Sequence, residues 1–97
     1  MIVLQPQRYR DAAHRLTKLS AEVRGGVTGE KAAAKIVAQE LESLAGDRST
    51  AVLQQLAEFA NKIRSRGTES PEQIDIMAAV LLELADLDDE AQAESDK

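Results

Sequence analysis

The stretch from Ser70 to Leu87 constrains the fold of this chain more than any other segment. It begins with a strong helix start, because Ser70 can cap a helix, Pro71 suits the first helical position, and Gln73 can hydrogen-bond back to the cap. The residues that follow are apolar around most of the helix circumference: Ile74, Ile76, Met77, Val80, Leu81, Leu82, Leu84 and Leu87. Such a helix has to be covered by the rest of the chain or by a partner.

Three further helices are predicted before it, at about residues 7–24, 29–45 and 47–66. In each segment apolar residues recur at steps of three and four, which places them on one face of a helix. The residues expected to face inward are Tyr9, Ala12, Leu16, Leu19 and Val23 in the first segment, Ala33, Ile36, Val37, Leu41 and Leu44 in the second, and Val52, Leu53, Leu56, Phe59, Ala60 and Ile63 in the third. Aromatic side chains are scarce, so the core has to be built from aliphatic residues and alanine.

Glycine and small polar residues predict where these helices begin and end. Thr28 is the expected cap of the second helix, and the third helix is expected to begin near Asp47 or Ser49. Gly46 and Gly67 are expected to end the second and third helices, because glycine readily adopts the left-handed conformation found after many helices.

The sequence therefore predicts an all-α protein, a small bundle of about four helices in residues 1–87 with a disordered acidic tail in residues 88–97. Short connections favour antiparallel neighbours. The tail contains several acids and no large apolar residue, so it cannot offset the entropy of ordering. The apolar arm Ile2-Val3-Leu4 is expected to pack over the bundle.

Most catalytic and metal chemistry lacks its residues here. The chain has no cysteine and a single histidine, His14, and no residue pattern provides a nucleophile with its base. The loop from Gly25 to Lys31 lacks the spacing and the hydroxyl residue of a phosphate loop. We therefore expect no enzyme activity, no cofactor and no metal site. No apolar run reaches the length of a membrane span, and the lack of cysteine is compatible with a cytoplasmic location.

Charge is divided unevenly along the chain. Residues 1–68 carry 11 Lys/Arg and 7 Asp/Glu, whereas residues 69–97 carry 1 and 10, within a net charge of −5. The basic side chains expected to bind a partner are Arg8, Arg10, Arg15 and Lys18 in the first helix and Lys62, Arg64 and Arg66 at the end of the third. The acidic segment after Leu87 is a second candidate for partner binding. Nucleic-acid binding through the basic face of the first helix is the alternative, disfavoured by the acidic total and the lack of stacking aromatics.

The last helix also predicts self-association. Five of its apolar residues are expected to form either the core of the bundle or the seam of a homodimer. They are Ile76, Met77, Val80, Leu81 and Leu84. Ile76, Leu82 and Leu87 lie at the margins of this set, where a bundle of short helices is not expected to cover every side chain. We expect a homodimer on this ground.

No motif assigns the chain to a family. In size, charge and lack of catalytic groups it is similar to several groups of small helical regulators: bacteriophage inhibitors of host defence or transcription, anti-sigma-type proteins and secretion chaperones. The sequence thus favours a non-enzymatic protein–protein interaction module, a small regulator or inhibitor that binds another protein and blocks or escorts it.

Overall fold

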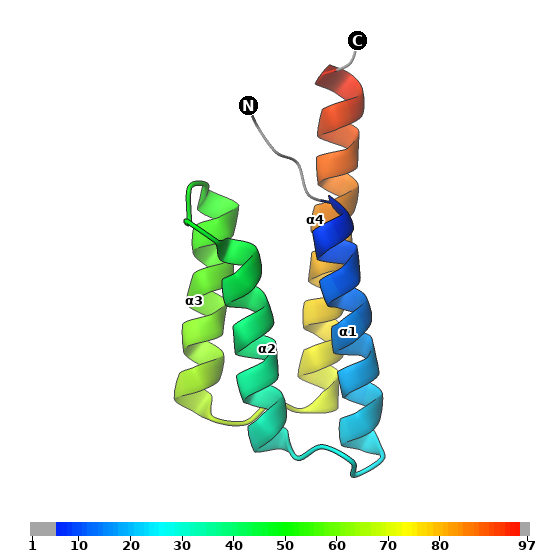
Figure 1. The fold of residues 1–97 in the computed structure, drawn as a ribbon, viewed down its shortest axis with the longest axis vertical. Helices are drawn as coiled ribbons and strands as arrows, with labels where there is room; N and C mark the ends of the chain where they lie inside the picture. The colour runs from blue at the N-terminus through cyan, green and yellow to red at the C-terminus, as the bar shows by residue number, and fades with distance from the viewer. Residues whose placement is uncertain (1–5, 96–97) are drawn as a thin grey trace.

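Four helices follow one another along the chain and are joined by short connections (Figure 1). They are α1 (Pro6–Arg24), α2 (Glu30–Ala45), α3 (Ala51–Arg66) and α4 (Pro71–Ser95). The computed structural model describes the backbone of residues 6–95 and the side chains of residues 6–90. The predicted all-α helical fold is confirmed, whereas the expected packing of Ile2-Val3-Leu4 concerns residues outside the described part of the chain.

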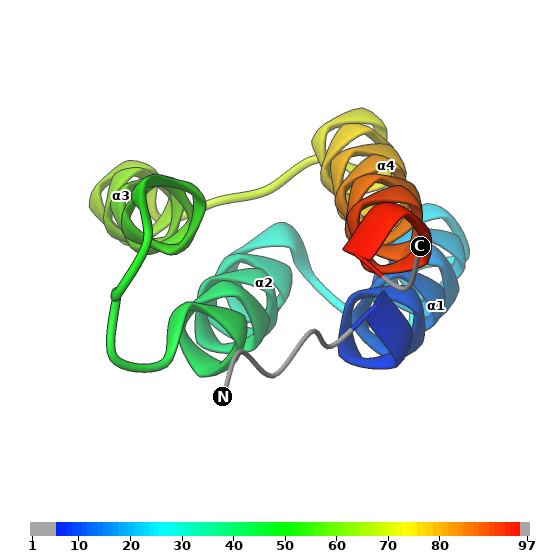
Figure 2. The same ribbon diagram turned by 90° about the horizontal axis from the view of Figure 1, so that it is seen from above.

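The helices run alternately up and down, but they form an open arrangement (Figure 2). The most extensive contact is between α1 and α4, the next between α2 and α3, and a smaller one joins α1 to α2. Within residues 6–95, α3 and α4 make no contact of similar extent. The molecule is accordingly flat in section, measuring 48 × 23 × 15 Å along its principal axes.

The start of α4 is built as the sequence predicts. The backbone N–H of Ser70 donates to Oε1 of Gln73 over 3.0 Å, and the backbone N–H of Gln73 donates to Oγ of Ser70 over 3.3 Å. This reciprocal capping satisfies donors that have no partner inside the helix. The connection before α4 is also fixed, because the N–H of Glu69 donates to the carbonyl of Glu30 at the start of α2 over 3.1 Å.

The starts of α2 and α3 differ from the prediction. Gly29 occupies the cap position of α2, while the hydroxyl of Thr28 donates to Glu22 over 3.3 Å. Thr50 caps α3 by accepting a hydrogen bond from the N–H of Leu53 over 3.1 Å. A start at Asp47 is prevented because Arg48 has a φ of 57°, and a start at Ser49 is prevented because Thr50 has an extended backbone.

Each helix contributes one leucine that is almost fully buried: Leu16, Leu41, Leu56 and Leu81 are at most 1% exposed. Much of the remaining core is alanine, including buried residues that the sequence did not single out: Ala13, Ala38, Ala45, Ala57, Ala78 and Ala85. Two residues predicted to face inward, Ile36 and Val52, are instead 42% and 44% exposed. An open arrangement covers fewer helix edges than a closed bundle, so residues at the margins of the apolar faces stay in contact with water.

The last helix is longer than the sequence predicts. It continues beyond Leu87 to Ser95, through most of the acidic segment that was expected to be disordered. Arg10 of α1 lies beside this part of the helix and pairs with Asp86 and Asp89. Residues 96 and 97 lie outside the described part of the chain, so the disorder expected for the tail stays a prediction there.

Candidate protein-binding surfaces

The basic residues of α1 lie largely in contacts between helices. Arg10 hydrogen-bonds to Asp89 and lies 3.6 Å from a carboxylate oxygen of Asp86, both on α4. Arg15 pairs with Glu40 of α2 at 2.8 Å, and Arg8 donates to the carbonyl of Ser43 on α2 over 3.0 Å. The hydrogen bond to Asp89 raises the pKa of Arg10. These guanidinium groups connect α1 to both of its neighbours.

The basic end of α3 is engaged in the same way. Arg64 makes two hydrogen bonds to the carboxylate of Glu42 on α2, one of them 3.0 Å long. Arg66 pairs with Glu69, a carboxylate that is only 1% exposed. Charge-assisted, two-point pairs of this kind are stronger than ordinary hydrogen bonds. The positive charge offered to a partner by this region is therefore smaller than the sequence predicts.

Lys62 and Lys18 make no ion pair within the described residues. The ammonium group of Lys62 lies 5.9 Å from the centre of the Phe59 ring, close enough for a cation–π interaction. Lys18 is exposed on α1. The seven predicted basic residues thus do not form one patch, because four of them contact a neighbouring helix, one pairs with Glu69 in the connection before α4, and two are exposed without an ion pair.

The predicted seam residues of α4 also divide between environments. Leu81 is fully buried, Met77, Val80 and Leu84 are partly buried, and Ile76 is 63% exposed. The expectation that the bundle leaves marginal residues uncovered is confirmed, because Leu82 and Leu87 are also exposed.

Apolar side chains lie at the edges of α3 and α4 that would meet if the bundle were closed. Asp75 and Asp89 of α4 pair with α1, and at 3.6 residues per turn Val80 lies on the opposite side of the helix. Arg64 marks the edge of α3 that faces Glu42, and Phe59 lies on the opposite edge. We call the following five residues the open side: Val52 and Phe59 of α3, and Ile76, Val80 and Leu87 of α4.

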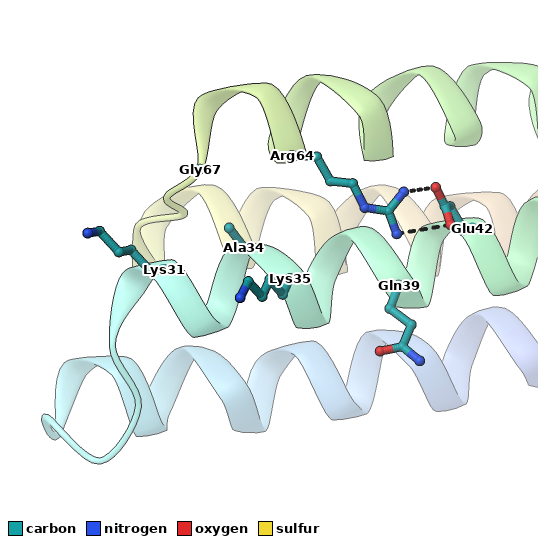
Figure 3. Close-up of a pocket in the computed structure, with 7 residues that line it drawn as sticks. All are labelled: Lys31, Ala34, Lys35, Gln39, Glu42, Arg64 and Gly67. Carbon is teal, nitrogen blue, oxygen red and sulfur yellow. Dashed lines mark hydrogen bonds and ion pairs between the residues drawn. The ribbon is translucent and has the colours of Figure 1, made fainter.

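A hollow of about 750 Å³ lies between α2 and α3 on the other side of the molecule (Figure 3). Its lining residues are Lys31, Ala34, Lys35, Gln39, Glu42, Arg64 and Gly67. Arg64 is turned toward Glu42, and Lys31 points away from that pair (Figure 3). Sequence reasoning missed this hollow because its residues come from two helices. With Arg64 neutralised by Glu42, only two exposed lysines are left for an anion.

Acidic side chains along α4 differ in their surroundings. The hydrogen bond from Arg24 is the main cause that lowers the pKa of Asp75. Burial first, and then the charge of Asp89, raises the pKa of Asp88. Burial, followed by the charge of Asp88, raises the pKa of Tyr9. No group of three or more His, Asp or Glu side chains lies close enough to hold a metal ion among the described residues.

Comparisons with protein-family models, curated proteins and solved structures found no match to this chain. Among the described residues, no helix combines the length and the apolar character needed to cross a lipid bilayer.

Proposed function

We propose that this protein is a non-enzymatic interaction module whose open side binds another polypeptide chain. One observation carries the proposal: α3 and α4 make no extensive contact within residues 6–95, although both present apolar side chains along the edges that would meet. Removing such side chains from water favours association by roughly 25 cal/mol per Å² of apolar surface. A helix from another chain, laid between α3 and α4, would complete the bundle.

By binding another protein at the open side, the protein would act as a small regulator or inhibitor that blocks or escorts its partner. The proposal places it in the cytoplasm, where a chain without cysteine is unaffected by the reducing conditions.

The alternative is nucleic-acid binding through the basic face of α1, and the ion pairs of Arg10 and Arg15 with α4 and α2 argue against it. Binding to duplex DNA with an affinity that falls steeply as salt rises would support this alternative.

The proposal is tested by comparing two variants of α4 as bait in extracts of the native host. Leu87→Asp places a charge on the open side, whereas Ala79→Asp places the same charge at an exposed position of the same helix away from it. We expect one or more proteins to be retained by the wild type and by Ala79→Asp and lost with Leu87→Asp. Equal retention by all three baits would contradict the proposal, provided that circular dichroism shows equal helix content.

A further inference from the structure

We propose that a second copy of this protein covers the open side, with α3 of each copy packed against α4 of the other. This inference rests on the proposed function, because it takes the open side to be a protein-binding surface. Three observations support it: the spacing of the apolar residues, their heights along the helices, and the distribution of charge between α3 and α4.

The apolar residues of the two helices have the same spacing. Val52 and Phe59 of α3 are seven residues apart, and so are Val80 and Leu87 of α4. Seven residues rise about 10.5 Å along a helix and return to nearly the same side of it. The two pairs can therefore make contact at two successive levels when the helices lie side by side and antiparallel.

A two-fold axis parallel to the helices produces that match without sliding either copy. Such an axis leaves every residue at its own height, and α3 ends where α4 begins, at one end of the molecule (Figure 1). Val52 lies about 21 Å above the last residue of α3, and Leu87 lies about 24 Å above the first residue of α4, at 1.5 Å per residue. The same calculation brings Phe59 level with Val80 to within about 3 Å.

Charge favours pairing of α3 with α4 over pairing of α4 with itself. The described side chains of α4 include no lysine or arginine, and its acids are Glu72, Asp75, Glu83, Asp86, Asp88, Asp89 and Glu90. Two such helices side by side would repel each other. The end of α3, in contrast, carries Lys62, an exposed cation that makes no ion pair within the described residues, near the height of the first turns of an antiparallel α4.

The arrangement also uses the open side twice. In a two-fold dimer each contact is repeated by symmetry, so α3 and α4 of both copies are covered together. A stable interface of ordinary size buries about 800 Å² on each partner. Two helix edges on each copy supply more buried area toward this value than one helix edge does.

Sedimentation equilibrium of the wild type and two variants tests self-association. We expect the wild type to approach twice the 10.5 kDa mass of the chain as its concentration rises through the micromolar range. Leu87→Asp should weaken the association at least tenfold, and Ala79→Asp should leave it within twofold of wild type. A wild type that stays monomeric throughout would overturn the inference.

Disulfide trapping tests the pairing of the helices, because the chain contains no cysteine of its own. Val52→Cys and Leu87→Cys are both at exposed positions and should not disturb folding. When the two variants are mixed and oxidised, the disulfide between them should form in excess over both symmetric products, as measured by mass spectrometry. An excess of the Leu87→Cys product would show α4 against α4 and overturn the arrangement.

The two tests separate this inference from the proposed function. If the wild type is monomeric but Leu87→Asp still loses the host protein, the open side is a binding surface and its occupant is not a second copy. A dimer that is unaffected by Leu87→Asp would overturn the placement on the open side.

Discussion

The two helix pairs of this protein, α1 with α4 and α2 with α3, are built from similar residues but make different contacts. Both pairs are antiparallel and rich in alanine, and each contains arginine–carboxylate pairs across the helices. The α1–α4 pair is linked at both ends, by Arg10 and by Arg24, and has the more extensive contact. The α2–α3 pair is linked through Arg64 and has a hollow of about 750 Å³ along one side.

The difference shows that the helices most distant in sequence hold this fold together. A buried hydroxyl group adds to the α1–α4 contact: Ser20 is fully buried, donates to the carbonyl of Pro71 over 3.2 Å and accepts from Arg24 over 2.7 Å. The α2–α3 pair is attached to this unit by the smaller contact with α1 and by the short connections. Stability should therefore depend more on α1 and α4 than on α2 and α3.

The largest predicted effect comes from shortening a buried leucine in each pair. Leu81→Ala in α4 and Leu56→Ala in α3 remove the same atoms from sites that are at most 1% exposed. Replacements of this kind cost about 2–5 kcal/mol, depending on how far the site can collapse. In urea unfolding, we expect the loss in free energy of unfolding to lie near the upper end of this range for Leu81→Ala and near the lower end for Leu56→Ala. Equal losses would mean that the two pairs contribute equally.

A smaller effect is expected from the buried hydroxyl group of α1. Ser20→Ala should lower the free energy of unfolding by about 1–2 kcal/mol, because the Pro71 carbonyl and the Arg24 guanidinium lose a partner. Thr17→Ala is the matched control, since its hydroxyl group donates to the carbonyl of Ala13 at an exposed position of the same helix. If both variants lose the same stability, the buried network does not set the α1–α4 pair apart.

The smallest effect is a pH dependence of opposite sign at two acids of α4. The lowered pKa of Asp75 means that its contribution is present above its unfolded pKa of about 4 and is lost as pH falls through the folded value. The raised pKa of Asp88 gives a contribution that is present below the unfolded value and is lost as pH rises through the folded one. At pH 7, Asp75→Asn should therefore destabilise the protein slightly and Asp88→Asn should stabilise it.

Thermal unfolding at pH 7 and at pH 3 measures both changes. Each difference from wild type should shrink at pH 3, because this pH lies below the unfolded pKa of both aspartates, where the contribution of Asp75 and the penalty from Asp88 are smaller than at pH 7. A destabilising Asp88→Asn at pH 7 would contradict the cause assigned to its raised pKa.

Local signals in the sequence predicted the elements of this fold well. The reciprocal cap between Ser70 and Gln73, the end of α3 at Gly67 and the four buried leucines all follow from residue type and helical spacing. Alanine gives no such signal, because it is tolerated on any face of a helix. The sequence therefore did not show that Ala38 and Ala45 help to bury a second side of α2.

The candidate sites were harder to predict, because a list of charged residues does not show which of them pair. Arg10, Arg15 and Arg64 were predicted to bind a partner, and in the structure each lies against an acid of another helix. The exposure of Ile76 and Leu87 was predicted, because marginal positions of a nearly all-apolar helix are difficult to cover. That α3 and α4 stay apart depends on tertiary packing, which has no local signature.

The order of the helices has a consequence for how the chain folds as it is made. Arg64 and Glu42, which join α3 to α2, are 22 residues apart, whereas Arg10 and Asp89 are 79 residues apart. Closing a longer loop costs more entropy, and long-range contacts form more slowly. During synthesis α2 and α3 can therefore associate early, whereas α1 leaves the ribosome before α4 and has to wait for it. A nascent chain that stops before α4 would leave the apolar face of α1 uncovered and open to chaperones and proteases.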